Sequence, residues 1–194
     1  MYNEKTLDLL ALNGIDVEVF NQKLHKTLLL GVFEVVCKEI KKQGSKTAER
    51  ASFRKFKNKT IPTKRIIKQY VGCELLDDDY EEMATLLGAF FNTGDPRKKF
   101  DAIYREQLTK KQNGKCAICK TNITAKSAHL DHIIPWDYVG DQLENNYQML
   151  CETCNERKGT AAYFEFSMLL LNKSEPLSKN EPPLGGGEPP PIEK

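Results

Sequence analysis

Long apolar runs are absent from this sequence. No stretch of about eighteen consecutive apolar residues, the length that crosses a bilayer, occurs in the 194 residues. The N-terminus also lacks the basic segment followed by an apolar segment that marks a secretory signal peptide. We therefore expect a cytoplasmic protein with no membrane partner. The net charge is only +2, so the overall charge balance does not indicate a partner by itself.

The sequence does contain a helical pattern over roughly its first 40 residues. From Ile15, apolar residues recur at spacings of four or five through Phe20 to Ile40. The stripe includes Leu24 and Leu28 and is widened by Leu29 and Phe33, which predicts an amphipathic helix. Asn13-Gly14 is typical of a break between a short first helix and this longer one. A second apolar helical segment covers residues 83–91. Together these patterns predict a helical N-terminal domain over residues 1–94.

Charge is distributed in blocks along this helical region. Residues 41–68 contain eleven Lys or Arg and one acidic residue, Glu49, and an acidic cluster follows at residues 74–82. A basic stretch of this kind is typical of a surface that binds a nucleic acid backbone without reading its sequence. Two alternatives stay open: a solvated basic face paired with the acidic cluster, or a surface for dimerisation or for a partner protein. The candidate nucleic-acid contacts here are Arg54, Lys55 and Lys57.

The second half of the chain begins with a further helix and ends in a tail. Asp95, followed by Pro96, is a typical helix start, and the helix is expected to end near Gly114. A last helix is expected at residues 161–171. Residues 172–194 contain six of the nine prolines and three consecutive glycines, with little apolar bulk. Such a segment cannot bury enough surface to offset its loss of entropy, so we expect it to be disordered.

Four of the six cysteines form two CxxC pairs. Four thiolates at this spacing fill all positions of a tetrahedral Zn²⁺ ion and leave none for water, so the expected zinc is structural. The alternatives are a redox-active pair or four thiols without a metal. Cys37 and Cys73 stand apart, and Cys37 is expected in the core. The candidate zinc ligands are Cys116, Cys119, Cys151 and Cys154.

The segment between the CxxC pairs carries three further motifs. They are AHLDHIIP at residues 128–135, NNYQMLC at 145–151 and CNERKG at 154–159. In this order, and together with the CxxC pairs, they resemble the HNH family of nucleases, whose fold is the ββα-metal finger. The resemblance covers about a quarter of the chain. It implies an HNH nuclease domain at residues 95–171.

The residue types in these motifs suit phosphodiester hydrolysis. His132 can accept a proton near neutral pH and so suits the general base that activates water. Asp131 and Asn155 offer hard oxygen ligands for Mg²⁺ or Mn²⁺. Neighbouring residues on a strand point to opposite faces, so Asp131 and His132 can serve one phosphate only at a bend or at the strand edge.

The resemblance implies a role for each motif residue. Asp131 and Asn155 are the implied ligands of the catalytic metal, and His132 is the implied base. Asn146 is implied to brace the loop that orients His132, with Asn145 as its rival. Arg157 and Lys158 are candidate nucleic-acid contacts, and the family motif favours Lys158.

We therefore predict an α+β fold that is mostly α, with a helical N-terminal domain followed by a small zinc-stapled ββα-metal finger with flanking helices. The predicted function is a metal-dependent HNH endonuclease acting on DNA, in restriction or phage defence, with RNA left open as a substrate. A double-strand cut would require a homodimer or repeated nicking. The alternatives are a non-catalytic zinc module that binds nucleic acid or protein, and a nuclease subunit that a partner activates.

Overall fold

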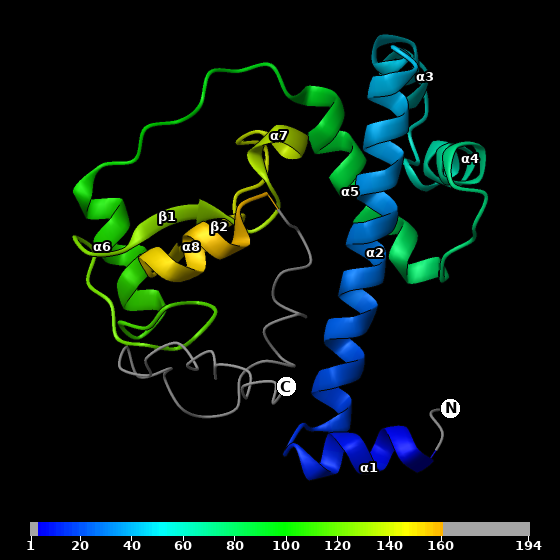
Figure 1. Cartoon of the computed structure of the whole chain (residues 1–194). Coiled ribbons are helices and arrows are strands. Elements are labelled where there is room, and N and C mark those ends of the chain that lie inside the picture. Colours follow the sequence, from blue (N-terminus) through cyan, green and yellow to red (C-terminus); the bar gives the residue numbers. More distant parts are fainter. Residues whose placement is uncertain (1–3, 161–194) are drawn as a thin grey trace, which may run out of the picture.

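The structure is a computed structural model that describes residues 4–160 of the chain. Within this range, eight helices and two strands follow one another (Figure 1). The last helix predicted at 161–171 and the disordered tail predicted at 172–194 lie outside the described residues. The elements are α1 Glu4–Leu12, α2 Val17–Lys42, α3 Lys46–Lys55, α4 Thr60–Tyr70, α5 Asp77–Asn92, α6 Ala102–Lys111, β1 His129–His132, α7 Trp136–Val139, β2 Tyr147–Leu150 and α8 Glu152–Lys158.

Helices α1 and α2 confirm the predicted break near the N-terminus. Between them, Gly14 has a φ of +63°, in the left-handed region that favours glycine. The carboxylate of Asp16 then caps α2 by accepting a hydrogen bond from Val19 N at 2.9 Å. The chain therefore turns sharply, and α1 lies across the end of the long helix α2 (Figure 1).

The C-terminal half of α2 supplies one side of the main hydrophobic core. Leu29, Phe33 and Ile40 are buried against residues of α4 and α5. Leu28, which the spacing pattern placed in the same stripe, is 61% exposed. The buried stripe is therefore rotated around the helix toward Leu29 and Phe33, because α4 and α5 both pack on that side.

The two charge blocks are neighbours in space. The basic stretch forms the end of α2, the whole of α3 and most of α4, and the acidic cluster leads into α5. Three Asp residues occupy the first turn of α5, where negative charge is favourable. Lys64 Nζ lies 2.9 Å from Asp77 Oδ1, and Lys68 Nζ lies 3.8 Å from Glu74 Oε1. Part of the basic stretch is thus paired with acidic side chains, as one of the alternatives expected.

The helix predicted to begin at Asp95 begins later, so its predicted start is wrong. The first residue of α6 is Ala102, and its N-cap is Asp101, whose Oδ1 accepts a backbone hydrogen bond at 2.8 Å. The preceding residues are held outside a helix by contacts with a distant loop. There, Lys98 N donates to Asp141 Oδ2 at 2.7 Å. A tertiary contact and a better cap therefore override the Asp-Pro pattern.

The C-terminal part of the described chain is a ββα finger. Strands β1 and β2 are antiparallel, with His129 opposite Leu150 and His132 opposite Tyr147. Helix α7 lies in the connection between the strands, and α8 follows β2 and packs against both strands. A second hydrophobic cluster, which includes Met149, lies beneath this sheet. The arrangement confirms the predicted fold class, a mostly helical α+β protein.

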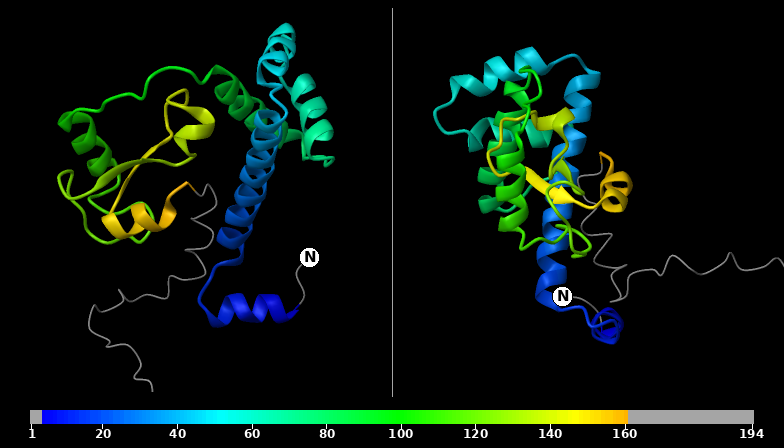
Figure 2. Two further views of the ribbon diagram at one scale, coloured as in Figure 1. Left: turned by 45° about the horizontal axis from the view of Figure 1, so that its top comes forward. Right: turned by 90° about the vertical axis from the view of Figure 1, so that its left-hand side faces the viewer.

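The finger is joined to the helical part through α7. Val139, the last residue of this short helix, and Ile134, two residues before its start, are buried in the main core with residues of α2 and α5. The sheet and α8 lie to one side of α2, as the left view of Figure 2 shows. Among residues 4–160, no helix is both long enough and apolar enough to cross a membrane.

Candidate active site

The four cysteines of the CxxC pairs lie together, although 31 residues separate the pairs in the sequence. Their Sγ atoms are all within 4.8 Å of one another. The first pair sits in a turn closed by the pairing of Lys115 with Asn122. The second pair begins at the N-cap of α8. The four residues are Cys116, Cys119, Cys151 and Cys154.

This cluster fits a tetrahedral metal. Zn–S bonds of about 2.3 Å place sulfur ligands about 3.8 Å apart, and the Sγ atoms of Cys119 and Cys151 are 3.6 Å apart. Burial raises the pKa of the Cys151 and Cys154 thiols. Burial also acts on Cys119, but hydrogen bonds from Thr121 and the neighbouring thiols outweigh it and lower its pKa to about 7. A divalent cation would let all four become thiolates without mutual repulsion, so a metal such as zinc fits.

Asp131 and His132 are adjacent on β1 and point to opposite faces of the sheet. Asp131 lies opposite Gln148, whose Nε2 donates to Asp131 Oδ2 at 3.0 Å. His132 lies opposite Tyr147, and their ring centroids are 4.9 Å apart. Cross-strand partners share a face, so these two contacts define two different faces. Because His132 is the last residue of β1, both side chains belong to the same end of the sheet.

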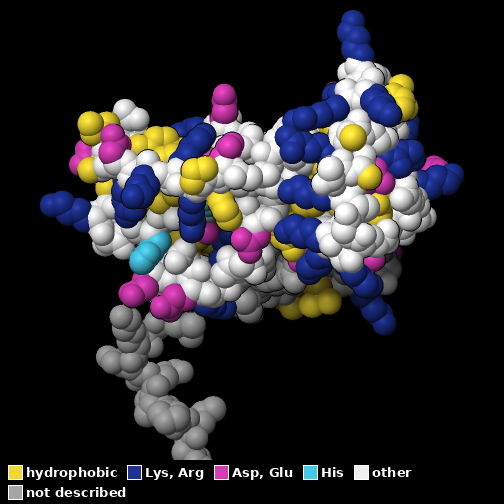
Figure 3. Space-filling model, turned by 90° about the horizontal axis from the view of Figure 1, so that it is seen from above, with side chains coloured by type: hydrophobic (Ala, Val, Ile, Leu, Met, Phe, Trp, Pro, Cys, Tyr) yellow, Lys and Arg dark blue, Asp and Glu magenta, His cyan; other side chains and the backbone are white. Residues whose placement is uncertain are grey.

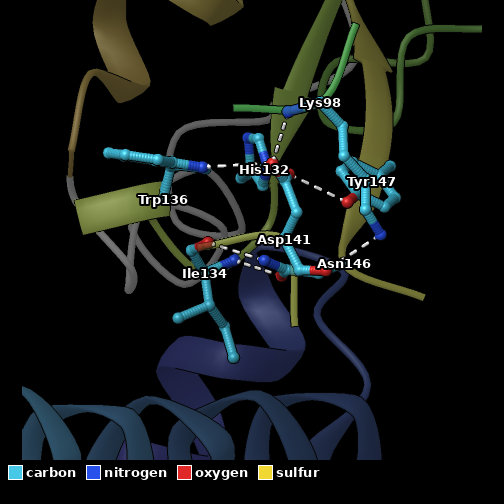
Figure 4. A network of polar contacts seen from close by, with 7 residues as sticks. All are labelled: Lys98, His132, Ile134, Trp136, Asp141, Asn146 and Tyr147. Carbon is cyan, nitrogen blue, oxygen red and sulfur yellow. Dashed lines mark hydrogen bonds and ion pairs between the residues drawn. The ribbon is translucent and has the colours of Figure 1, made fainter. Parts of the chain in front are cut away.

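The His132 side chain is only 3% exposed and is hydrogen-bonded to a second buried residue. Its Nε2 lies 2.8 Å from Asp141 Oδ1, and the Asp141 side chain is also 3% exposed. Asp141 accepts three further hydrogen bonds, from Lys98 N at 2.7 Å, Tyr147 OH at 2.9 Å and Trp136 Nε1 at 3.2 Å (Figure 4). Burial alone would raise the pKa of Asp141, but these hydrogen bonds outweigh it and lower the pKa to about 2. Asp141 is therefore a buried carboxylate that stays ionised.

Asn146 fastens the turn that follows β1. Its Oδ1 accepts a hydrogen bond from Ile134 N at 2.7 Å, and its Nδ2 donates to Ile134 O at 2.8 Å (Figure 4). Its backbone oxygen also accepts from Ile133 N at 2.9 Å. Asn145, the rival residue, is exposed. The structure thus brings Asn146, rather than Asn145, against the loop that leaves His132.

Lys158 lies in a different place from the one expected of a phosphate contact. Its side chain is 3% exposed, and its Nζ donates to His132 O at 2.7 Å and lies 2.9 Å from Asp131 Oδ2. An ammonium group engaged in this way does not face solvent. The neighbouring Arg157 is exposed. Of the two candidate nucleic-acid contacts, Arg157 is therefore the exposed one, because α8 turns Lys158 under the end of β1.

Asn155 lies inside α8 and is half-buried, so it is not the helix cap. The amide oxygen of Asn155 and the carboxylate of Asp131 are the hard donors that Mg²⁺ and Mn²⁺ accept, with water and a phosphate completing the shell. The Asp131 side chain is 17% exposed, and Lys158 already holds one of its oxygens. A cation binding there would share the carboxylate with the ammonium group or displace it. The donor chemistry fits a hard divalent cation.

The basic residues singled out in the sequence lie away from the finger, at the tip of the helical part. Arg54 and Lys55 end α3, Lys57 is in the loop after it, and all three are exposed. Arg54 Nη2 donates to Asn92 Oδ1 at 3.0 Å. Figure 3 views the molecule from this end and shows many Lys and Arg side chains over its helical part. Positive charge is therefore displayed on the helical part of the molecule.

Comparisons with known proteins agree with the motifs. Residues 116–171 match the family model described as HNH endonuclease. The chain is also 32% identical over 62 residues to the CRISPR-associated endonuclease Cas9 of Corynebacterium diphtheriae. That match covers 31% of this chain and only 6% of the relative. No solved structure matches the chain. HNH nucleases act on nucleic acids, so both matches support a nuclease.

The sequence motifs did not reveal Asp141 as part of this site. It lies nine positions after His132 in a loop with no spacing pattern. The one local indication is Gly140, which has a φ of +56° and therefore reverses the chain just before Asp141. A glycine can mark a turn, but it does not tell which side chain the turn brings inward.

Proposed function

We propose that this protein, which carries an HNH endonuclease segment at residues 116–171, is a metal-dependent endonuclease that hydrolyses phosphodiester bonds in DNA. The observation that carries the proposal is the end of β1. There, the buried imidazole of His132 is hydrogen-bonded to the carboxylate of Asp141. Asp131, the proposed metal ligand, directly precedes His132 on β1. A module that only binds zinc has no use for this combination.

His132 is the proposed general base. An imidazole whose one nitrogen is bound to a carboxylate has its other nitrogen free to take a proton from water. Asn146 fixes the loop after His132 through two buried hydrogen bonds to Ile134. Lys158 fixes the backbone oxygen of His132. These contacts hold the base in one place, which lowers the cost of orienting it during the reaction.

Two different metals belong to this proposal. Zn²⁺ at the four cysteines would hold the finger together without taking part in the reaction. Mg²⁺ or Mn²⁺ would be held by Asp131 and Asn155. When bound, such a cation stabilises the negative charge that develops on the phosphate and on the leaving oxygen.

The proposed substrate is the backbone of DNA. The exposed cations Arg54, Lys55 and Lys57 on the helical part, and Arg157 on the finger, would bind phosphates without reading the sequence. The relative's printed name describes a CRISPR-associated endonuclease, and a role in restriction or phage defence in the cytoplasm is our proposal for this chain. One finger makes one break, so a double-strand cut would need a homodimer or two successive nicks.

Metal-dependent nicking of a supercoiled plasmid tests the proposal. The zinc-loaded protein should convert supercoiled to open-circular DNA with Mg²⁺ or Mn²⁺, stop with EDTA, and resume when Mg²⁺ is restored. Asp131→Ala and Asn155→Ala should remove nicking while the zinc content stays at the wild-type level. Nicking that persists in EDTA, or that both variants retain, would contradict the assigned metal ligands.

One observation favours a second candidate function. The His132 side chain is 3% exposed, and Asp131 is engaged by Lys158, so little of the site faces solvent in this arrangement. A subunit that a partner opens, or a zinc module without activity, would have this property. A wild-type protein that binds DNA but never nicks it with either metal would favour this second function.

A further inference from the structure

Outside the expected motifs, the buried carboxylate of Asp141 stands out by its hydrogen bonds. Each of its carboxylate oxygens accepts two hydrogen bonds. Oδ1 receives His132 Nε2 and Tyr147 OH, and Oδ2 receives Lys98 N and Trp136 Nε1. Because four donors surround this buried carboxylate, both of its oxygens act as hydrogen-bond acceptors. Figure 4 shows these donors converging on Asp141 from the linker, β1, α7 and β2.

This geometry determines where the imidazole carries its hydrogen. An ionised carboxylate has no hydrogen to donate, so at 2.8 Å from Oδ1 the Nε2 of His132 must be the donor. In a neutral imidazole with hydrogen on Nε2, the lone pair is on Nδ1. Within residues 4–160, Nδ1 of His132 has no hydrogen-bond partner, and this atom is not fully buried. It therefore keeps some contact with solvent.

We infer that Asp141 is a positioning residue that holds hydrogen on Nε2 of His132 and thereby makes Nδ1 the nitrogen that accepts the proton from water. The inference rests on the proposed nuclease function for its consequence, but the hydrogen position itself does not depend on activity. In the proton transfer, the O–H bond of water breaks, Nδ1 gains the proton, and the imidazolium that results is stabilised by the negative charge of Asp141.

Residues outside the family match complete this arrangement. Lys98, in the linker before α6, contributes its N–H to Oδ2 and also donates from Nζ to Asp141 O at 3.2 Å. Phe100 from the same linker packs edge-on against Tyr147, with ring centroids 4.7 Å apart. The HNH segment begins only at residue 116. The linker of this chain thus supports the base from outside the matched HNH segment.

Asp141→Asn is the informative variant, because an amide can present an N–H to Nε2 where the carboxylate cannot. Asp137→Asn is the matched control, since Asp137 is exposed and lies four residues earlier in the same connection. The first readout is ¹⁵N NMR of the full-length zinc-loaded protein above the titration range of imidazole. It should show His132 protonated at Nε2 and bare at Nδ1 in the wild type and in Asp137→Asn. Asp141→Asn should shift the hydrogen toward Nδ1.

The second readout is nicking kinetics. Asp141→Asn should lower kcat by about tenfold or more, with KM within about twofold of wild type, because the base and not the substrate surface is altered. Hydrogen on Nδ1 in the wild type, or an unchanged hydrogen position and kcat in Asp141→Asn, would overturn the inference. The wild-type spectrum decides the hydrogen position even if the variant does not fold. A wild type with the expected spectrum and no nicking would reject the nuclease proposal instead.

Discussion

At the scale of single residues, the site depends on buried hydrogen bonds whose loss is costly. Asn146 is 4% exposed and satisfies both the N–H and the carbonyl of Ile134. A buried backbone group that loses its partner costs about 1–3 kcal/mol. The residue therefore contributes to stability and also fixes the backbone from which the His132 side chain projects.

Asn146→Ala should lower the free energy of unfolding by about 2–4 kcal/mol, because two buried backbone groups lose their partners. Nicking should fall by at least about tenfold, since the base is no longer held in place. Chemical denaturation and plasmid nicking measure the two effects. Asn145→Ala is the control, as Asn145 is exposed, and it should match the wild type in both. Equal effects of the two substitutions would show that Asn146 does not brace this loop.

The motif residues could be named from sequence because their spacing is local. Asp131, His132 and Asn155 sit in short recognisable strings of residues. The roles of Asp141 and Lys158 could not be read in that way. Each depends on a contact across the hairpin or from α8 onto β1, and such contacts exist only once the chain has folded.

At the scale of elements, the ββα finger is too small to be held by its own core. Its strands have four residues each and α8 has seven. The cluster beneath the sheet includes the buried cysteines Cys116 and Cys154. Small domains of this kind commonly need a metal to stay folded. The sulfur cluster joins the turn before β1 to the start of α8.

Cys151→Ser should bind less zinc than the wild type, which should hold about one tightly bound zinc per chain. The finger should also melt at a lower temperature. Metal analysis by mass spectrometry and thermal unfolding provide the two measurements. Cys73→Ser is the control, because Cys73 is half-buried and lies outside the cluster. Full zinc content and wild-type melting in Cys151→Ser would rule out this residue as a ligand.

Within the described residues, the helices predicted from local patterns are present, and the one misplaced helix start has a physical reason. The break at Asn13-Gly14 and the long second helix were predicted from local patterns. The start of α6 was not, because Asp101 provides the cap and Lys98 is drawn to Asp141 in a loop 43 residues away. Local rules predict an element well when no distant contact competes with them.

At the scale of the whole molecule, the protein combines a finger that would cut with a helical part that displays positive charge. Part of that charge is neutralised by the acidic residues before and within α5. Lys55 and Lys57, at the end of α3 and after it, have no such ion pair among the described residues. They are therefore the clearest candidates to bind a phosphate backbone.

Lys55→Glu combined with Lys57→Glu should weaken DNA binding and flatten its salt dependence. Each lost phosphate contact lowers the slope of log K against log salt by about 0.9. Fluorescence anisotropy over a range of salt concentrations measures the slope. The control is Lys5→Glu with Lys26→Glu, two exposed positions in α1 and in the part of α2 nearer to it (Figure 1). An equal change of slope in both double variants would mean that α3 is not a specific contact.

The central claim is that His132 activates water for cutting nucleic acid, and plasmid nicking with Mg²⁺ by three proteins tests it most directly. The wild type and His129→Ala should nick at similar rates, because His129 is exposed and lies on the same strand. His132→Ala should be slower by about 10² or more, the usual contribution of a general base. A His132→Ala protein that nicks as fast as the wild type would contradict the claim.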